Sequence, residues 1–536
     1  MGGEPADDAA VHHVPFARYH LAVPAPTPFL TKVLATVGPA CDGVDAIGSL
    51  IDEGARVFRI NFSHGDFDEH TQRLRAVREA AEQRGVPVGV LGDLRGPKLR
   101  LGPLAEDAVR VEPGDRVEFT GGERPGYREP QTGETILSVT YPPFVDEVEP
   151  GHRVLINDGA IRMLAVERVG RDGEGRLICS VTHGGEIEAN KGVNLPDSDL
   201  STPSLTDFDR ECVAWAIEHE IDYLALSFVR RSSDVEELRG ELRDRRDGVE
   251  GSDASRMFVV AKLETPQAIA DLQAILNASD AVMVARGDLG VEMDLAEVPV
   301  IQKKIIEQAH DHGKPVIVAT QMLQSMIKQS APTRAEVSDV ANAILDGADA
   351  VMLSGETAVG MQPSAAVHVM SHTAEITEAY AAERWGQKRR PPRNPRESRY
   401  RTAALAHGVS VVVRDLDARY VVMWSELGGG ARLLSQNRLT VPILAVSSNP
   451  RALARMSLLF GVVPLHMPRP EDGDAFVGRI DELLQQRGWA EPGDPIVIAH
   501  GEPLGIPGVT NKIRIHHVGD LARLERHALE QSTPAR

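Results

Sequence analysis

Eight short apolar runs alternate with helical stretches along this chain of 536 residues. The runs are Lys32–Val37, Val57–Asn61, Val86–Leu91, Tyr223–Phe228, Met257–Lys262, Ala281–Ala285, Pro315–Ala319 and Ala350–Leu353. Such runs are typical of strands buried on both faces of a parallel sheet. Alternating strands and helices imply right-handed crossovers, and eight such units are what a closed barrel requires. The sequence therefore predicts an α/β chain built on a (β/α)8 TIM barrel.

Polar side chains lie at or directly after the ends of these runs, where barrel strands would end. They are Thr36, Asn61 and Ser63, Asp93, Ser227, Lys262 and Glu264, Asp288, Thr320, and Ser354 and Glu356. Active sites of such barrels lie at the carboxyl ends of the strands. The pattern therefore predicts one shared polar mouth.

Composition limits the function classes open to this chain. A formal net charge of −20 argues against a general binder of nucleic acid or anionic membranes. The three cysteines, Cys41, Cys179 and Cys212, form no metal-binding spacing and favour a reducing compartment. No run approaches the roughly 18 apolar residues of a membrane span, and the start of the chain does not read as a signal peptide. We expect a cytoplasmic protein without nucleic-acid or membrane partners.

The spacing of the runs breaks once, after the third run, where short β-type pieces lie between Gly, Pro and Asp turns. An insertion at this point can close over the mouth as a lid. The Arg- and Pro-rich stretch 387–401 is interpreted as a solvated linker rather than a contact for an anionic partner. The predicted boundaries are 1–28 for a disordered tail, 29–99 and 196–370 for the catalytic TIM barrel, 100–195 for a small β-barrel lid, 371–401 for a helix and linker, and 402–536 for a C-terminal α/β domain.

Two tracts place charged groups directly after neighbouring runs. Lys262 and Glu264 lie at the end of the fifth run, and Asp288 follows the sixth. Two carboxylates on adjacent strand ends can share Mg²⁺ when a substrate phosphate completes its shell. Lys262 points the same way as Glu264 from a strand, and a cation there suits a phosphoryl group in transfer. On these residues alone, ion pairing of the carboxylates with arginines at the mouth is an equally good interpretation.

Taken together, the motifs resemble those of the pyruvate kinase family. They are Lys262 with Glu264, Arg286-Gly287-Asp288, Thr320-Gln321-Met322, Ser354-Gly355-Glu356-Thr357, Arg59-Ile60-Asn61-Phe62-Ser63-His64-Gly65 and Thr333-Arg334-Ala335-Glu336. The resemblance runs from about Leu30 to the end and is weaker in the lid and the last domain. It implies phosphoryl transfer from phosphoenolpyruvate to ADP, giving pyruvate and ATP, the final step of glycolysis. It also implies a Mg²⁺ cofactor, with Mn²⁺ as an alternative, and a homotetramer.

The resemblance assigns roles to individual residues. Lys262 would stabilise the moving phosphoryl group, and Arg59 would bind it with its guanidinium fork. Thr320 would contact the substrate and take part in protonating the enolate. The two carboxylates would hold the metal, and Gly287 beside Asp288 would let a helix N-terminus approach the substrate carboxylate.

The nucleotide side carries fewer signals. No Gly-x-x-x-x-Gly-Lys-Ser/Thr loop is present, so the chain is not a P-loop kinase. Lys191 lies at the return from the lid, so it would reach the nucleotide phosphates only in a closed state. Asp158 either comes in with the lid or is a hairpin-turn residue. The resemblance assigns nucleotide contacts to Asn61, Phe62, Ser63, His64, Arg100 and Lys191.

One departure from many relatives concerns potassium. Relatives that need K⁺ hold it with side chains matching Asn61, Ser63 and Asp93 and with the carbonyl of residue 94. They typically have Thr where Leu94 stands and Glu where Lys98 stands. The chain resembles the K⁺-independent branch, in which these four positions are a vestigial K⁺ site and Lys98 supplies the positive charge for catalysis. The alternative is that Lys98 is an exposed hinge residue.

The resemblance also implies an effector site in the C-terminal domain, and the matching loop runs from Ser425 to Arg432. Its glycines precede a helix and could form an anion nest, or they could form an ordinary turn. The basic and hydroxyl residues common in relatives that respond to fructose-1,6-bisphosphate are sparse there, which argues against this bisphosphate as the effector. A nucleotide or a sugar monophosphate is the candidate effector, and the alternative is a domain that takes no effector.

Two other functions are consistent with the carboxylate pair. One is a Mg²⁺-dependent barrel lyase acting on a pyruvate-type enolate, which would need neither Lys191 nor Arg100 nor a lid. The other is a catalytically weak metabolite sensor on the same fold. ATP formation from phosphoenolpyruvate and ADP, with and without Mg²⁺, separates the three hypotheses.

Overall fold

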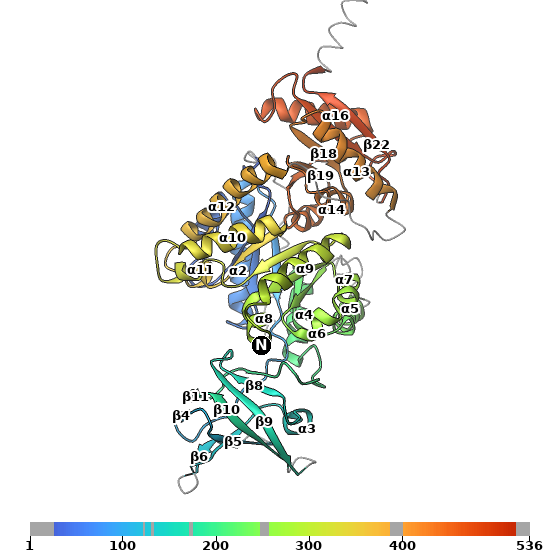
Figure 1. The fold of residues 1–536 in the computed structure, drawn as a ribbon. Coiled ribbons are helices and arrows are strands. Elements are labelled where there is room, and N and C mark those ends of the chain that lie inside the picture. The colour runs from blue at the N-terminus through green and yellow to red at the C-terminus, as the bar shows by residue number, and fades with distance from the viewer. Residues whose placement is uncertain are drawn as a thin grey trace, which may run out of the picture.

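The computed structural model describes residues 26–121, 124–129, 133–170, 175–246, 257–385, 400–506 and 508–520. Three bodies lie in a row, with the barrel in the middle (Figure 1). The lid lies on one side of the barrel and the C-terminal domain on the other. Most of the predicted tail and linker falls at 1–25 and 386–399, outside the described residues.

The central body is a closed barrel of eight parallel strands, which confirms the predicted fold class. Its order is β1-β17-β16-β15-β14-β13-β3-β2, so neighbours in sequence are neighbours in space. The strands are β1 (Lys32–Thr36), β2 (Ala55–Asn61), β3 (Gly89–Asp93), β13 (Tyr223–Val229), β14 (Phe258–Leu263), β15 (Ala281–Ala285), β16 (Val316–Ala319) and β17 (Ala350–Leu353).

Helices surround the barrel and seal its apolar outer face. Their starts carry clear signals: Asp66 caps α2 by accepting from the Glu69 N–H, and Thr333 forms a capping box with Glu336 at α10. The larger surrounding helices are α1 (Val44–Asp52), α2 (Phe67–Arg84), α4 (Asp207–Glu218), α5 (Ser232–Arg246), α7 (Leu272–Ala278), α9 (Val298–Asp311), α10 (Arg334–Asp346) and α12 (Pro363–Trp385). Short helices at the mouth are α6 (Pro266–Ala270), α8 (Arg286–Glu292) and α11 (Gly355–Ala358), with a 3-10 turn, η2 (Gln324–Ile327).

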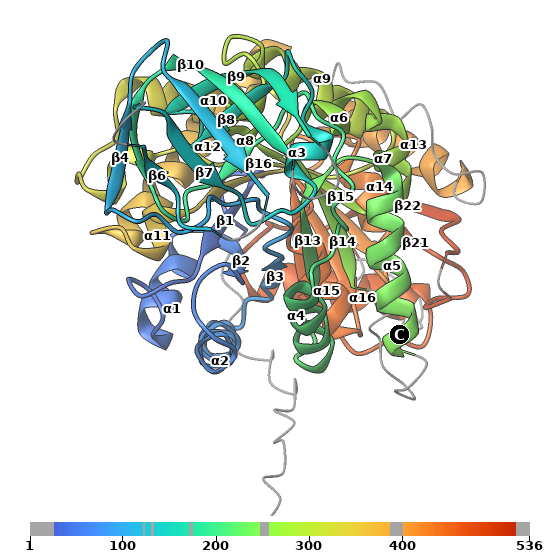
Figure 2. The ribbon, with the colours of Figure 1, turned by 90° about the horizontal axis from the view of Figure 1, so that it is seen from below.

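The lid is inserted between β3 and β13 and lies in front of the barrel when viewed from below (Figure 2). Its seven-stranded sheet has the order β12-β8-β9-β10-β5-β7-β6, and β4 and β11 form a separate ribbon. In the part of the lid that the structure describes, the two sheets are not joined into one closed barrel. The elements are β4 (Ala108–Val111), β5 (Arg116–Thr120), β6 (Tyr127–Arg128), β7 (Thr135–Ser138), α3 (Phe144–Glu147), β8 (Arg153–Ile156), β9 (Ile161–Val169), β10 (Arg176–His183), β11 (Gly185–Glu188) and β12 (Val193–Asn194).

The C-terminal domain is an open five-stranded sheet of order β20-β19-β18-β21-β22, with only β22 antiparallel. Its strands are β18 (Tyr420–Trp424), β19 (Ile443–Ser447), β20 (Val462–His466), β21 (Pro495–His500) and β22 (Lys512–His517). Its helices are α13 (Tyr400–Asp415), α14 (Gly429–Ser435), α15 (Pro450–Met456) and α16 (Gly473–Gln486).

This domain packs on the amino-terminal end of the barrel, away from the mouth. Leu458 joins the apolar cluster inside the barrel. The Tyr223 hydroxyl donates to the Arg455 carbonyl at 2.5 Å, and Lys32 Nζ donates to the Val462 carbonyl at 2.8 Å. The barrel floor and the C-terminal domain therefore share buried polar contacts. None of the described helices is long and apolar enough to cross a membrane.

Candidate active site

The ends of β2, β3 and β14 bring four charged side chains together. Arg59 Nε donates to Asp93 Oδ2 at 2.6 Å, and Lys262 Nζ lies 3.2 Å from Asp93 Oδ1. Lys262 Nζ also lies 3.0 Å from Glu264 Oε1. All four side chains are at most 12% exposed. Two cations and two anions from three strand ends thus form one largely buried network.

Ser227 and Phe228, near the end of β13, form hydrogen bonds with this network. Lys262 Nζ donates to Ser227 Oγ at 2.6 Å, and Ser227 Oγ donates to the Leu94 carbonyl at 2.7 Å. The Phe228 N–H donates to Glu264 Oε2 at 2.7 Å. Phe228 has φ 54°, a conformation that bulky residues rarely adopt. Backbone strain at this point aims an N–H group at a candidate metal ligand.

The electrostatics of the network follow from burial and pairing. Burial lowers the pKa of Lys262, but the carboxylates of Asp93 and Glu264 outweigh it and raise the pKa above its ordinary value. Burial alone would raise the pKa of Asp93, but Lys262 and Arg59 hold it below its ordinary value. Lys262 therefore stays an ammonium group and Asp93 a carboxylate at neutral pH.

Glu264 behaves differently from Asp93. Burial raises its pKa, the Lys262 ammonium opposes this, and the like charge of Asp288 raises the pKa further. A cation between the two carboxylates would remove this repulsion, so the residues present fit a divalent metal. Among the described residues no group of three or more His, Cys, Asp or Glu side chains forms a metal cluster. A metal here would therefore have two protein carboxylates and need substrate oxygens.

Asp288 and Gly287 lie on α8, which begins at Arg286, where the sequence predicts that a helix opens. The Gly287 N–H donates to Thr320 Oγ1 at 2.7 Å, so this N–H group is taken by a side chain. A Cβ at position 287 would lie 3.3 Å from Thr320 Oγ1. A larger residue here would press on the Thr320 hydroxyl, which would have to shift by a few tenths of an ångström.

Arg286 braces the turn after β16, a role that the sequence motif did not indicate. Its guanidinium donates to the Thr320 carbonyl at 2.9 Å and to Asp339 at 2.7 Å. Thr320 and Gln321 have φ 68° and 56°. Two successive positive φ values, one at a β-branched residue, are strained and typical of functional turns.

Ser354 and Glu356 extend the polar mouth beside this turn. Glu356 is 1% exposed and accepts from the Leu323 and Ser354 N–H groups at 3.1 and 2.8 Å. Ser354 Oγ is buried without a hydrogen-bond partner.

The candidate nucleotide residues lie in two places. Asn61, Ser63 and His64 form the turn after β2, where Asn61 Oδ1 accepts from the Ser63 N–H at 3.1 Å. Phe62, in contrast, is 1% exposed and packs edge-on against His70 and Trp215. The Phe62 side chain belongs to the core, so only its backbone can reach a nucleotide.

The second place is the junction of lid and barrel. Arg100 pairs with Gly192 as an isolated bridge and donates to the Asn190 carbonyl at 2.9 Å. Lys191 lies between Asn190 and Gly192 in sequence, and its Nζ lies 2.7 Å from Glu188 Oε2. Arg100 and Lys191 are thus brought together at the base of the lid.

Lys98 lies at the outgoing connection to the lid. Its Nζ is 3.6 Å from Asp158 Oδ1, and Asn157 and Asp158 occupy the turn between β8 and β9 with φ 55° and 52°. Asp158 is therefore a hairpin-turn residue that also faces the hinge lysine. Of the four positions predicted to be a vestigial K⁺ site, the Asp93 carboxylate and the Leu94 carbonyl have partners in Arg59 and Ser227, respectively.

A second lid contact reaches α8. Glu292, at its last turn, accepts from Asn194 Nδ2 on β12 at 2.7 Å, and both residues are buried. Burial raises the pKa of Glu292 to about 7. No motif in the sequence connects these two positions.

The candidate effector loop turns at Gly428, with φ 81°, into α14. Ser425 Oγ accepts from the Ala431 N–H at 3.2 Å. The serine thus supports the turn, as an ordinary strand-to-helix connection requires.

Two family models match this chain. The model described as "Pyruvate kinase, barrel domain" matches residues 30–367, and the model described as "Pyruvate kinase, alpha/beta domain" matches residues 403–516. The two together span most of the described barrel, lid and C-terminal domain.

Curated proteins and a solved structure give the same family. The chain is 39% identical to a pyruvate kinase from Corynebacterium glutamicum, covering 92% of this chain and 99% of that protein. It is 40% identical to a pyruvate kinase from Mycobacterium tuberculosis strain H37Rv, covering 91% and 98%. A crystal structure of a pyruvate kinase from Cryptosporidium parvum superposes with a TM-score of 0.82 at 31% identity, covering 92% and 98%.

Proposed function

The chain belongs to the pyruvate kinase family, and we propose how its barrel mouth carries out the family's reaction. The reaction transfers the phosphoryl group of phosphoenolpyruvate to ADP, giving pyruvate and ATP. The observation that carries the site assignment is the Arg59–Asp93–Lys262–Glu264 network at the strand ends. The lyase and metabolite-sensor alternatives find no support in the comparisons.

Lys262 faces the phosphoryl group in this proposal. Its neighbours keep it protonated, and its ammonium is fixed by Ser227, Asp93 and Glu264 before substrate arrives. A preorganised cation stabilises charge that develops on the transferred oxygens without reorganising. Arg59 is held by Asp93 and keeps donors for the same phosphate.

Glu264 and Asp288 would hold Mg²⁺, which pyruvate kinases generally need. When bound, the ion supplies Lewis-acid charge at the phosphate and enolate oxygens. The chain's own contribution is to keep Glu264 in place through the Phe228 N–H.

In this proposal Thr320 assists the protonation of the enolate. Its hydroxyl accepts from the Gly287 N–H and donates to the Ala319 carbonyl at 2.6 Å. A hydroxyl at a strained turn beside α8 can orient a water that protonates the methylene carbon of the enolate.

The proposal includes independence from K⁺. The Leu94 carbonyl accepts from Ser227, and the Asp93 carboxylate lies against two cations, so both groups have protein partners without a monovalent ion. Lys98 carries the positive charge at the hinge, where Asp158 pairs with it at 3.6 Å. Substrate phosphate would compete with Asp158 for this lysine.

The nucleotide, the effector and the assembly complete the proposal. Asn61, Ser63, His64, Arg100 and Lys191 bind ADP, with the last two brought in by lid closure. A nucleotide or sugar monophosphate is the candidate effector at the Gly428 loop, and the enzyme assembles as a homotetramer. Light scattering of the purified enzyme tests the assembly.

A coupled assay tests the site assignment. We expect ATP formation from phosphoenolpyruvate and ADP that requires Mg²⁺ and is nearly maximal without K⁺ at constant ionic strength. Glu264→Gln should raise the Mg²⁺ concentration needed for half-maximal rate by at least about tenfold. An unchanged Mg²⁺ requirement in this variant would refute the metal assignment, and a large activation by K⁺ would refute the role of Lys98.

A further inference from the structure

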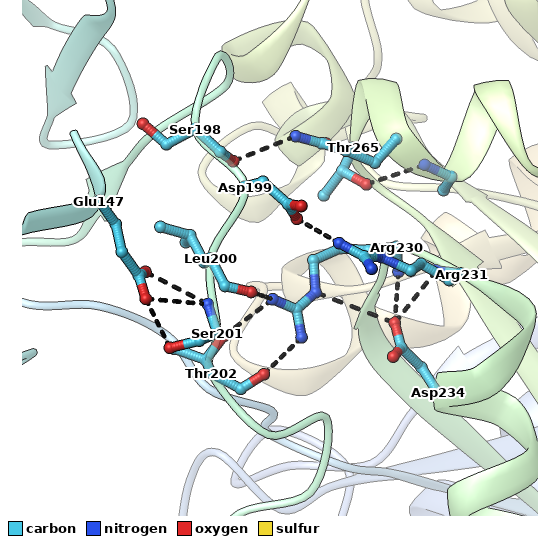
Figure 3. Close-up of polar contacts among 12 residues, drawn as sticks. Glu147, Ser198, Asp199, Leu200, Ser201, Thr202, Arg230, Arg231, Asp234 and Thr265 are labelled. Carbon is cyan, nitrogen blue, oxygen red and sulfur yellow. Dashed lines mark hydrogen bonds and ion pairs between the residues drawn. The ribbon is translucent and has the colours of Figure 1, made fainter. Parts of the chain in front are cut away.

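The return connection from the lid to the barrel, residues 197–202, has side-chain contacts to both domains, and Figure 3 shows those of residues 198–202. We call this segment the return strap. A flexible hinge would show few side-chain contacts. The strap instead carries contacts from every one of its residues, to the lid, to the barrel or to both.

Two lid residues hold the strap from the lid side. Arg153 donates to both oxygens of Asp197, at 2.9 and 2.7 Å. Glu147, on α3, accepts from the Ser201 N–H at 3.2 Å and from Ser201 Oγ at 2.5 Å. A rotation of the lid would therefore displace the return strap through these two contacts.

Arg230 holds the strap from the barrel side. Its guanidinium donates to the Leu200 carbonyl at 2.6 Å, to Thr202 Oγ1 at 3.0 Å and to the Thr202 carbonyl at 2.6 Å. The backbone N–H of Arg230 donates to Asp234 Oδ2 at 2.8 Å, and the Arg230 side chain is 14% exposed. The contacts come from two nitrogens of one rigid plane, which a guanidinium fork provides and a single ammonium nitrogen does not.

Arg230 is also close in sequence to the catalytic network. Ser227, which accepts from Lys262, and Phe228, whose N–H donates to Glu264, precede it, with only Val229 between. The Val229 carbonyl accepts from Thr265 at 3.2 Å, which fixes the backbone of this stretch. A displacement of Arg230 is therefore passed to the groups that place the ammonium and the metal carboxylate.

We propose that Arg230 is a positioning residue that couples the return strap of the lid to the Lys262–Glu264 pair through residues 227–229. The lid position and the geometry of the reacting site are then set together. The inference rests on the proposed function of this site and adds a residue with no direct contact to substrate. A misplacement of about 1 Å at a reacting centre can reduce the rate about 100-fold, which sets the scale of the effect.

The test compares Arg230→Met with Arg231→Ala in the full-length enzyme. Arg231 is the matched control, because it is the neighbouring arginine, pairs with Asp199 of the same strap and is 54% exposed. We expect Arg230→Met to lower kcat about 10- to 100-fold and to raise KM for ADP more than KM for phosphoenolpyruvate. For Arg231→Ala, we expect kcat, KM for ADP and KM for phosphoenolpyruvate to stay within about twofold of the wild type.

Further variants separate coupling from a loss of stability. Arg230→Lys keeps the charge but carries its donors on one nitrogen instead of a planar fork, so we expect an intermediate kcat with a thermal midpoint near that of the wild type. Glu147→Ala releases the strap from the lid side, and in a double variant with Arg230→Met its effect on kcat should be smaller than in the wild-type background. The proposal is wrong if the wild type is active and Arg230→Met and Arg230→Lys match Arg231→Ala, or if kcat per folded enzyme is unchanged and only the midpoint falls. A wild type without ATP formation would instead refute the proposed function.

Discussion

Lys32 offers a quantitative test of how the barrel meets the C-terminal domain. It is the first residue of β1, it is 5% exposed, and its Nζ donates to the first residue of β20, Val462. Burial, and then the charge of Arg56, lower the pKa of Lys32 from 10.5 to about 7, while Glu378 partly opposes them. The ammonium is thus disfavoured in the folded protein.

The sign of the pH dependence follows from this difference. Between pH 7 and pH 10.5 the unfolded chain binds more protons at Lys32 than the folded chain, so stability rises with pH in this window. The two pKa values correspond to a destabilisation of about 4 kcal/mol at pH 7 and about 2 kcal/mol at pH 9. The contribution therefore changes by about 2 kcal/mol over two pH units.

Lys32→Met removes this titration while keeping an apolar chain of similar length. Loss of the hydrogen bond to Val462 opposes the gain by about 1–3 kcal/mol. We expect the variant to be more stable than the wild type by about 1–3 kcal/mol at pH 7 and nearly equal to it at pH 9. Urea unfolding followed by circular dichroism at pH 7, 8 and 9, with refolding checked, measures the difference. A difference that does not change with pH would refute the reasoning, since all other groups are common to both proteins.

Three further predictions concern the active site. Lys262→Arg keeps a buried cation beside Asp93, so the fold should be retained while turnover falls at least about 100-fold; turnover near the wild type would contradict the role of the ammonium. Thr320→Val keeps the β-branched shape but loses the acceptor of the Gly287 N–H, and should lower turnover about 100-fold with no comparable rise in KM for ADP. Lys98→Glu combined with Leu94→Thr should make the enzyme depend on K⁺, measured as at least about tenfold activation at constant ionic strength, and a double variant indifferent to K⁺ would contradict the charge argument.

The strands of the barrel could be predicted from the sequence because their signals are local. Ala281–Ala285 and Ala350–Leu353 begin and end where the apolar runs do. The polar ends also met as expected, because parallel strands place their carboxyl ends at one rim. The lid strands Tyr127–Arg128 and Thr135–Ser138 could not be predicted in this way, because they are too short for an alternation of apolar and polar residues to be recognised.

Contacts between distant residues could not be predicted in this way. Arg286 donates to the Thr320 carbonyl and Asn194 to Glu292, but neither pair has a spacing that marks it. Phe62 lies between two polar site residues in sequence, yet its side chain packs in the core, because alternation along the chain places its ring on the buried side. Membership in a motif therefore did not decide which atoms face the site.

The insertion of the lid between β3 and β13 also has a consequence for biosynthesis. Tyr223 on β13 pairs with Leu91 on β3, so the barrel cannot continue past its third strand until the whole lid has been synthesised. If the lid collapses on its own apolar cluster as it emerges, it shortens the loop that separates the two strands and lowers the entropy lost on pairing them. The lid would then act as a folding unit before it acts as a cover, and a variant that slows its collapse would leave a half-barrel with an open strand edge exposed to aggregation.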